Sequence, residues 1–207
     1  MQQVTPPLPI QFRGSALARR VLGWFGWRLH FQGLPGLHGV IVVYPHTSNW
    51  DFLVGLLAKW GMGIEAKFWG KHTLFRIPLF GLWLRWLGGV PIDRSAAQGV
   101  VGQMVDLFEH KRQAGDYFWL ALAPEGTRSW RPAWRSGFYR VAVGARVPLM
   151  VAALDYGRKE VRLVDVIDLS GHEADDMQKI ARVLQGCTGL RVDQAAPIRL
   201  EGSKEGP

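Results

Sequence analysis

The sequence contains a single cysteine, Cys187, among 207 residues. One thiol excludes an internal disulfide framework and a zinc site built from several thiolates. Cys187 lies far along the chain from the motifs described below, with no base near it in sequence, and we expect it to be inert. Without disulfides, the cytoplasm is the expected compartment.

The sequence also lacks an apolar run long enough for a transmembrane helix. Its most apolar stretch, residues 77–92, is interrupted by Arg85, Gly88 and Gly89, and it falls short of the roughly 20 residues that a membrane span needs. The first residues, MQQVTPPLPIQF, are polar and proline-rich, unlike a signal peptide. These features predict a protein that touches a membrane without crossing it.

Acidic residues are fewer than basic ones, 17 against 25, which gives a formal net charge of +8. A positive excess favours anionic partners such as nucleic acids, phosphorylated substrates or an acidic lipid surface. Tryptophan is abundant, with ten residues. Tryptophans serve as interfacial anchors in membranes, as stacking platforms for bases or as core residues, and composition leaves the three roles open.

Strands alternate with helices along the chain, which indicates an α/β fold: a single layered domain with a mostly parallel central sheet flanked by helices. Residues 39–44 and 117–123 are apolar runs typical of buried parallel strands. The other expected strands are residues 66–69, 89–92, 147–157 and 159–169, and the expected helices are residues 48–60, 72–87, 98–113, 136–145 and 173–185.

Residues 15–31 predict an N-terminal amphipathic helix that ends before Gly33. Arg19 and Arg20 lie off its apolar arc, and Trp27 does not fit the pattern. Such a helix either lies in a lipid interface or packs on its own domain, and the pattern leaves both open. An arc about 160° wide holds the apolar side chains Leu17, Val21, Leu22, Trp24, Phe25 and Leu29.

A histidine and an aspartate follow the first buried strand, in VVYPHTSNWDF (residues 42–52). His46 lies in a loop leaving the carboxyl end of a strand, where α/β folds place their sites. Ser48 and Asp51 also match a capping box, in which the acid only satisfies amides of the first helical turn. The roles are compatible, because a capping Asp51 could also hold one ring nitrogen of His46 and leave the other free as a base. No second histidine or carboxylate stands at ligand spacing, so we expect no metal site.

The segment LAPEGTRSW (residues 122–130) leaves a second buried strand at its carboxyl end. Gly126 allows close approach of the backbone to a ligand, Thr127 offers a hydroxyl and Arg128 offers a planar fork suited to phosphate. Alone, the block could be a surface turn with a salt bridge. Together with His46 it indicates a site made by two loops at one edge of the sheet.

With these residues the sequence resembles the lysophospholipid (1-acylglycerol-3-phosphate) acyltransferases, in a compact bacterial branch. Their hallmarks are His-x4-Asp, matched by His46 and Asp51, and Pro-Glu-Gly-Thr-Arg-Ser, matched by residues 124–129. Between these the family has a lysine-led segment ending in Pro-x-x-Gly and a segment ending in Ile-Asp-Arg, which KHTLFRIPLFG and GGVPIDRS match in order and spacing. The family usually has asparagine before the histidine, where this chain has Pro45.

The resemblance implies a glycerolipid O-acyltransferase of phospholipid biosynthesis. It would move a fatty acyl chain from acyl-CoA or acyl-carrier protein to the free hydroxyl of a lysophospholipid such as 1-acylglycerol-3-phosphate. His46 would be the base and Asp51 would hold its ring, with no covalent acyl-enzyme and no tightly bound cofactor. The implied substrate-binding residues are Arg128, Lys71 and Arg94 for the acceptor's phosphate, Gly126 and Thr127 as donors, and Glu125, which accepts from the acceptor's glycerol or braces its own loop.

An acceptor in a bilayer implies a peripheral or monotopic protein on the cytoplasmic side of the bacterial inner membrane. It would dock on anionic lipid through its N-terminal helix and residues 79–87. We divide the chain into a membrane-interface helix and linker (residues 1–36), an α/β acyltransferase domain (37–200) and a loose tail (201–207). Acylation of another lyso-lipid, such as a lyso-amino-acid lipid, and a non-catalytic lipid-surface module are the alternatives. A nucleic-acid binder is a further class, but no motif for it is recognised, and we expect no nucleic-acid partner.

Overall fold

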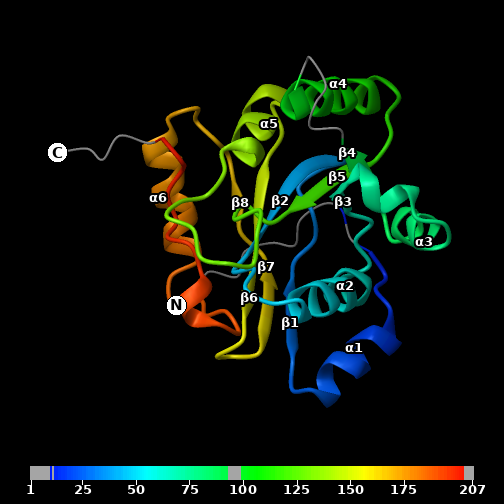
Figure 1. The fold of residues 1–207 in the computed structure, drawn as a ribbon, viewed down its shortest axis with the longest axis vertical. Coiled ribbons are helices and arrows are strands. Elements are labelled where there is room, and N and C mark those ends of the chain that lie inside the picture. Colours follow the sequence, from blue (N-terminus) through cyan, green and yellow to red (C-terminus); the bar gives the residue numbers. More distant parts are fainter. Residues whose placement is uncertain (1–9, 11, 93–98, 203–207) are drawn as a thin grey trace.

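The computed structural model describes residues 10, 12–92 and 99–202, with the backbone alone at Lys71 and Ile92. Arg94, residues 1–9 and 11 of the N-terminal segment, and residues 203–207 of the expected tail lie outside this description. The described residues form an eight-stranded sheet with helices on both faces (Figure 1). The expected α/β class with a mostly parallel sheet is therefore confirmed.

The elements have the following bounds. The strands are β1 (Arg28–Phe31), β2 (His38–Tyr44), β3 (Lys67–Lys71), β4 (Gly89–Ile92), β5 (Phe118–Leu122), β6 (Leu149–Asp155), β7 (Glu160–Leu163) and β8 (Val166–Ile167). The helices are α1 (Ala16–Trp24), α2 (Trp50–Met62), α3 (Phe80–Trp86), α4 (Gly99–Gln113), α5 (Gly137–Ala145) and α6 (Glu173–Val183), with short 3-10 helices η1 (His72–Arg76) and η2 (Val192–Gln194).

The sheet has the strand order β1-β7-β6-β2-β5-β3-β4, and β8 pairs with β6. The central strand β2 is parallel to both of its neighbours, β5 and β6, and β3 lies parallel between β5 and β4. β7 and β8 run antiparallel to β6, while the edge strand β1 is parallel to β7. The carboxyl ends of β2, β5 and β6 therefore meet at one edge, where ligands of such sheets bind.

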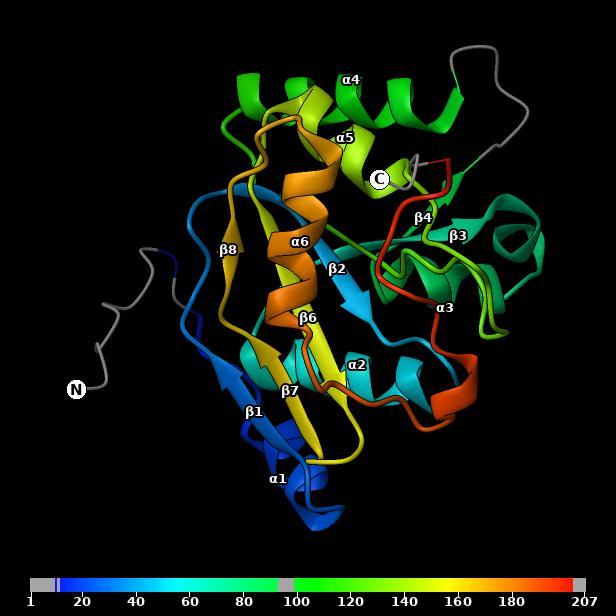
Figure 2. The same cartoon turned by 90° about the vertical axis from the view of Figure 1, so that its left-hand side faces the viewer.

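Two apolar layers cover the faces of the sheet. The side chains of β2 alternate between them, with Val40 and Val42 in one layer and Ile41 in the other. Phe108 of α4 contributes to the first layer together with side chains of α5 and α6. Leu22 of α1 contributes to the second layer with side chains of α2. Figure 2 shows α6 in front of the sheet and α2 behind it.

The helix expected over residues 15–31 is wrong beyond Trp24. α1 ends there, and Gly26 adopts a φ of 79°, which favours glycine and turns the chain away from the helix axis. The following residues form β1, which joins the edge of the sheet beside β7. Trp27, which did not fit the helical pattern, is buried after this turn. The N-terminal segment thus supplies a strand of the central sheet as well as a helix.

One side of α1 is packed and the other is open. Ala18 and Leu22 are buried, and Arg19 donates a hydrogen bond of 2.8 Å to the carbonyl of Gly61 in α2. The open side carries the exposed side chains Leu17 and Trp24. Packing on the domain therefore leaves an apolar face of α1 available for a lipid interface. Neither α1 nor any other helix in the described ranges is long and apolar enough to cross a bilayer.

Two further expectations need correction. Residues 72–87 form η1 and α3 rather than one helix, because Pro78 disfavours a helical conformation of the residue before it and Leu79 adopts a φ of 60°. Residues 159–169 form two strands, because β7 pairs with one end of β6 and β8 with the other.

Candidate active site

Two loops leave neighbouring strands at one edge of the sheet. β2 ends at Tyr44 and leads into His46, and β5 ends at Leu122 and leads into Glu125. The two strands are a parallel pair in which Val42 lies opposite Leu122. The expectation that both loops leave the same edge is therefore confirmed.

The side chains of His46 and Asp51 face each other. Nδ1 of His46 lies 3.3 Å from Oδ2 of Asp51. The same carboxylate oxygen accepts hydrogen bonds from the amides of Thr47 at 2.6 Å and Ser48 at 2.7 Å. One carboxylate thus binds two amides ahead of the helix and also faces the imidazole.

The start of α2 differs from the expected capping box. The helix begins at Trp50 with Asn49 at the N-cap, and the Ser48 hydroxyl accepts a hydrogen bond of 3.2 Å from the amide of Trp50. Ser48 is therefore not the N-cap. The helix expected over residues 48–60 is therefore displaced by two residues.

Asp51 is almost closed to solvent, with 1% of its side chain exposed against 19% for His46. Burial alone would raise the pKa of its carboxyl, but hydrogen bonds from His46, from the Tyr156 hydroxyl and from the Ser48 amide outweigh burial and hold the pKa below its usual value. The group therefore stays ionised at neutral pH. A carboxylate so placed fixes the ring and stabilises an imidazolium when one forms.

Glu125 is buried and joins the two loops. Its Oε2 accepts a hydrogen bond of 2.6 Å from the amide of His46, and its Oε1 accepts one of 2.9 Å from the amide of Ala196. Burial raises the pKa of Glu125, against the effect of these two amides. Of the two expected roles, bracing is the one that the contacts support, although the braced loop is that of His46 rather than its own.

The rest of the Glu125 block forms an exposed turn. Gly126 has a φ of 66°, in the left-handed region that favours glycine, and a Cβ there would meet Nε of Arg135 at 3.0 Å. Thr127 Oγ1 accepts a hydrogen bond of 3.3 Å from the amide of Ser129 and so stabilises the turn itself. Arg128 is exposed and forms no ion pair with the described residues. Its guanidinium is therefore open to an anion at this edge.

The two other cations expected to bind phosphate are less fully described. Lys71 is the last residue of β3, which is parallel to β5, so its backbone lies toward the same edge as the two loops. The structure describes no side chain for Lys71, and Arg94 lies outside the described residues. Their approach to a phosphate stays a prediction.

A C-terminal segment, residues 187–200, lies against both loops. The amide of Ala196 binds Glu125, and its carbonyl accepts a hydrogen bond of 3.0 Å from the hydroxyl of Tyr44. The amide of Arg191 donates to Oγ1 of Thr47 at 3.2 Å. Figure 2 shows this orange-to-red segment beside the end of β2 and the start of α2. These bonds use backbone groups of the segment, so no residue pattern in it could have indicated them.

Cys187 also belongs to the C-terminal segment. Its Sγ lies 4.0 Å from the carbonyl oxygen of Tyr44, so the residue is far from the motifs in sequence but close to them in space. Burial, followed by the negative charge of Asp155, raises the pKa of the thiol to about 12. A thiol with that pKa stays protonated at neutral pH and is a poor nucleophile, which agrees with the expected inertness.

Tyr156 contacts the site but was missed in the sequence. Its hydroxyl donates a hydrogen bond of 2.7 Å to Oδ1 of Asp51. A signal was available, because Tyr156 directly follows the apolar strand β6, and the end of that strand lies beside the end of β2. Sequence alone could not show that β6 and β2 are neighbours.

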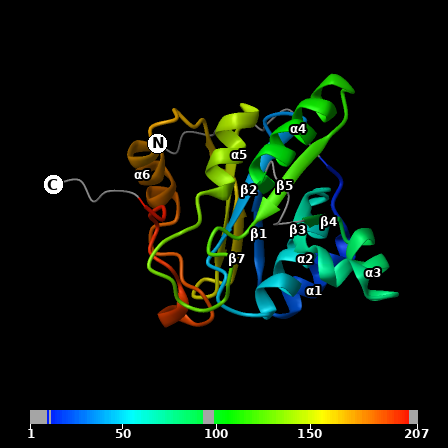
Figure 3. The same cartoon turned by 45° about the horizontal axis from the view of Figure 1, so that its top comes forward.

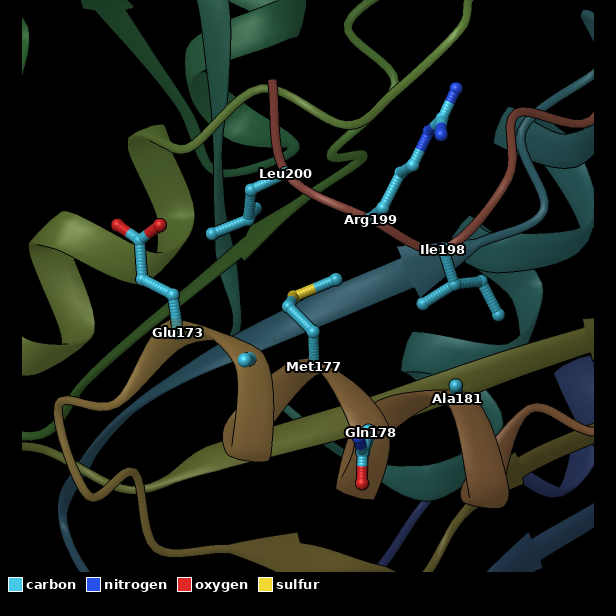
Figure 4. A pocket seen from close by; sticks show the side chains of 8 residues that line it. Glu173, Met177, Gln178, Ala181, Ile198, Arg199 and Leu200 are labelled. Carbon is cyan, nitrogen blue, oxygen red and sulfur yellow. The ribbon is translucent and has the colours of Figure 1, made fainter. Parts of the chain in front are cut away.

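A hollow of about 220 Å³ lies elsewhere, between α6 and residues 198–200 (Figure 4). Met177 of α6 points between Ile198 and Leu200, and the lining is mostly apolar. Neither His46 nor Asp51 lines it, and we assign it no part in the chemistry. Within the described ranges, no three side chains of the His, Cys, Asp and Glu types converge as metal ligands would.

Comparison with known proteins agrees with the resemblance seen in the sequence. No curated protein sequence matches the chain. Among solved structures, the chain is similar to the 1-acyl-sn-glycerophosphate (LPA) acyltransferase PlsC from Thermotoga maritima, with 21% sequence identity and a TM-score of 0.51 over 82% of this chain and 74% of that one. At this identity the similarity supports the fold. Residues 26–154 match the family model described as Acyltransferase. Because this match spans more than half of the residues, the chain belongs to the Acyltransferase family.

Proposed function

We propose that the protein transfers a fatty acyl group from an acyl thioester to the free hydroxyl of a lysophospholipid such as 1-acylglycerol-3-phosphate. The observation that supports this best is the pair of His46 and Asp51, with Nδ1 and Oδ2 at 3.3 Å and the carboxylate held by two amides. The similar PlsC structure is that of a 1-acyl-sn-glycerophosphate acyltransferase, which favours this class of acceptor.

His46 is the general base of the proposed reaction. Its Nε2 takes the proton of the acceptor hydroxyl while the hydroxyl oxygen bonds to the thioester carbonyl carbon. The carbon–sulfur bond then breaks, and the departing thiolate takes this proton from the imidazolium, which restores the neutral imidazole. Asp51 faces Nδ1 and stabilises the ring while it is charged, a role that resembles the aspartate of hydrolytic triads. No acyl group is attached to the protein, and no tightly bound cofactor takes part.

Arg128 binds the phosphate of the acceptor. Its guanidinium is exposed on the turn that follows Glu125, and Glu125 is bonded to the amide of His46. The turn that carries Arg128 is therefore linked to the backbone of His46 by the hydrogen bond to the buried Glu125 carboxylate. A guanidinium binds phosphate through two parallel hydrogen bonds, which would orient the acceptor as well as hold it. Thr127 offers its hydroxyl proton to the substrate, whereas the amide of Gly126, the other expected donor, already donates to the carbonyl of Ala123 at 3.2 Å. Lys71 and Arg94 are the further cations that we expect to contact the phosphate.

The protein docks on an anionic bilayer through the side that carries α1, α2 and α3, which lie close together in Figure 3. The rings of Trp60 in α2 and Trp86 in α3 are in contact, with centroids 6.0 Å apart. Trp50 is 62% exposed and directly precedes Asp51, so the apolar surface begins beside the site. The exposed apolar side chains of this surface are Leu17, Trp24, Phe25, Trp50, Leu53, Leu74, Ile77, Leu79, Phe80, Leu82, Trp83 and Trp86.

The charge of this surface favours anionic lipid. Arg76 and Arg85 are exposed on η1 and α3, and Arg20 is exposed on α1. A basic residue near an anionic surface contributes about 1 kcal/mol, and buried tryptophan and leucine side chains add an apolar contribution. An enzyme held this way at the cytoplasmic face of the inner membrane meets a lipid acceptor in the bilayer and a soluble donor, either acyl-CoA or acyl-carrier protein.

The test combines a substrate panel with a matched pair of variants. The purified full chain is incubated with acyl-CoA or acyl-carrier protein and with 1-acylglycerol-3-phosphate, other lysophospholipids or a lyso-amino-acid lipid, and the products are identified by mass spectrometry. We expect 1-acylglycerol-3-phosphate to be converted to a product that carries two fatty acyl groups. His46→Ala should lower its rate by about 10²- to 10⁴-fold. His110→Ala, a change at an exposed position of α4, should leave the rate unchanged.

The outcomes separate the alternatives. If the enzyme prefers a different lysolipid, the proposed acceptor is wrong but the proposed acyl transfer stands. Vesicle binding without any acylated product would favour a lipid-surface module. Turnover by His46→Ala equal to that of the unmodified protein would refute the assignment of the base.

A further inference from the structure

Asp51 is bonded on both of its oxygens. Oδ2 faces His46 and accepts the amides of Thr47 and Ser48, while Oδ1 accepts the hydroxyl of Tyr156 at 2.7 Å. Tyr156 is thus the side chain bonded to the oxygen that does not face the imidazole. Because only 1% of the Asp51 side chain is exposed, water has little access to replace this donor.

The bond from Tyr156 acts on the orientation of the carboxylate. Two amides and an imidazole on one oxygen fix where that oxygen lies, but the carboxylate can still tilt about it. A donor on Oδ1 fixes the second oxygen and therefore the plane of the group. A buried oxygen without its donor would instead have an unsatisfied hydrogen-bonding capacity, which favours a different rotamer.

Tyr156 is itself held by segments from both ends of the chain. Its ring meets that of Trp27 edge to face, with centroids 4.9 Å apart and planes at 86°. Its amide donates a hydrogen bond of 2.8 Å to the carbonyl of Thr188 in the C-terminal segment. Trp27 follows α1, and Thr188 precedes the residues that bind Glu125 and Thr47. The position of the Tyr156 hydroxyl is therefore determined by packing on one side and by a backbone bond on the other.

We propose that Tyr156 is a positioning residue that sets the orientation of Asp51 and, through it, the tautomer and orientation of His46. The proposal rests on the proposed function for its effect on rate, but its structural part does not. A correctly oriented carboxylate keeps the proton of the neutral imidazole on Nδ1 and leaves Nε2 free to act as the base. Without the Tyr156 hydroxyl, the carboxylate tilts, the Nδ1 proton is held less firmly and fewer molecules have an available Nε2.

The test uses Tyr156→Phe, which removes the hydroxyl and keeps the ring against Trp27. Tyr139→Phe is the matched control, because the Tyr139 hydroxyl donates a similar bond of 3.0 Å to Asp176, a buried aspartate of α6. Both variants lose a tyrosine–aspartate hydrogen bond, but only one of these bonds reaches His46. A merely structural role of Tyr156 predicts that the two variants behave alike.

Two measurements are made on each variant. The first is steady-state acyl transfer, in which Tyr156→Phe should lower kcat by about 10- to 100-fold with little change in KM. The second is nitrogen-15 NMR of the histidine rings in the protein without substrate, in which the Nδ1-protonated form of His46 should lose population in Tyr156→Phe. Tyr139→Phe should match the unmodified protein in both measurements.

The NMR measurement requires no substrate, so it distinguishes failure of this inference from failure of the proposed function. An unchanged His46 ring spectrum in Tyr156→Phe would overturn the inference, whether or not the rate falls, because Tyr156 would then not act through the histidine. A changed spectrum with an unchanged kcat would also overturn it. Absence of acyl transfer by the unmodified protein would contradict the proposed function but leave the structural part of the inference under test.

Discussion

The amide of His46 donates a hydrogen bond of 2.6 Å to Oε2 of Glu125, a residue 79 positions further along the chain. This bond ties the loop after β2 to the loop after β5 without using the imidazole. The ring of His46 thus remains available for chemistry while its backbone is fixed. Glu125 contacts the backbone of His46, the proposed base, and the resemblance to known acyltransferases alone did not indicate this contact.

Removal of the Glu125 carboxylate should therefore disturb His46. In Glu125→Ala, the buried amides of His46 and Ala196 lose their acceptor. We expect kcat to fall by about 100-fold, since displacements near 1 Å at a catalytic group have effects of that size. The free energy of unfolding should fall by about 1–3 kcal/mol. Steady-state kinetics and urea unfolding measure the two effects, and Glu109→Gln on the exposed side of α4 serves as the control. A Glu125→Ala protein with normal kcat would show that the loop holds its position without this bond.

Arg128 should affect acceptor binding rather than the chemical step. Loss of a charge-assisted pair of hydrogen bonds costs about 1.5–3 kcal/mol, which corresponds to a roughly 10- to 100-fold higher KM for a phosphate-bearing acceptor. We expect this result for Arg128→Ala, with a smaller effect for Arg128→Lys, which keeps the charge but loses the planar fork. Arg140→Ala, at an exposed position of α5, is the control. If Arg128→Ala instead changed kcat and left KM unaltered, the phosphate role would be wrong.

The α3 region should anchor the protein to lipid. Leu79 is 83% exposed at a φ of 60°, so Leu79→Gly removes an apolar side chain at a position where glycine is the less strained residue. Combined with Trp86→Ser, this change should weaken binding to phosphatidylglycerol vesicles by about tenfold or more, since each buried large apolar side chain contributes about 1.5–3 kcal/mol. Flotation or co-sedimentation measures the binding.

Val143→Ser, which changes an exposed apolar residue of α5 on the opposite face of the sheet, controls for a general loss of surface apolarity. The Leu79 and Trp86 variant should keep its activity on a short-chain acceptor that is soluble in water. Vesicle binding equal to that of the unmodified protein would exclude this region as the anchor.

Asp176 should make the stability of the fold depend on pH in the acidic range. Burial acts to raise the pKa of this carboxyl, but the ammonium of Lys179, the amide and hydroxyl of Ser170 and the hydroxyl of Tyr139 outweigh it and lower the pKa to about 2. Because the folded state has the lower pKa, this stabilisation is present above about pH 4 and is lost as the pH falls from 4 toward 2. The contribution is about 2 kcal/mol.

Urea unfolding at pH 7 and at pH 3 measures this contribution. Asp176→Asn should lower the free energy of unfolding at pH 7 and should lose less between the two pH values than the unmodified protein. Asp175→Asn, at the exposed neighbouring position, should behave like the unmodified protein. An identical loss of stability in all three proteins would assign the acid sensitivity to other carboxyl groups.

Local patterns predicted much of the fold and part of the site. The apolar runs of β2 and β5 and the polar residues after them were sufficient to place His46 and Glu125 at one edge, because parallel strands bring their carboxyl ends together. The apolar periodicity of residues 15–31 did not reveal that Leu29 belongs to a strand, since a short amphipathic stretch satisfies both patterns once Gly26 breaks the helix. Residues 28–31 form a strand because they pair with β7, and this pairing joins residues more than 130 positions apart.

The supporting residues were the least predictable part of the site. Ala196 contributes only its amide and carbonyl, groups that every residue other than proline also has. Tyr156 has a side chain suited to its contact, but its importance depends on β6 lying next to β2. The residue types that perform chemistry are visible in a single sequence, whereas backbone acceptors and donors become visible only once the strand order is known.

The C-terminal segment has a consequence for how the protein can be divided. The region that matches the family ends at residue 154, yet the hydroxyl on Asp51 comes from Tyr156 and the second amide on Glu125 comes from Ala196. A recombinant fragment cut at the family boundary would keep His46, Asp51 and the turn that carries Arg128. It would lose the hydrogen bonds from Tyr156 to Asp51 and from Ala196 to Glu125. Chimeras that exchange acceptor preference between relatives should therefore place their C-terminal junction after residue 200.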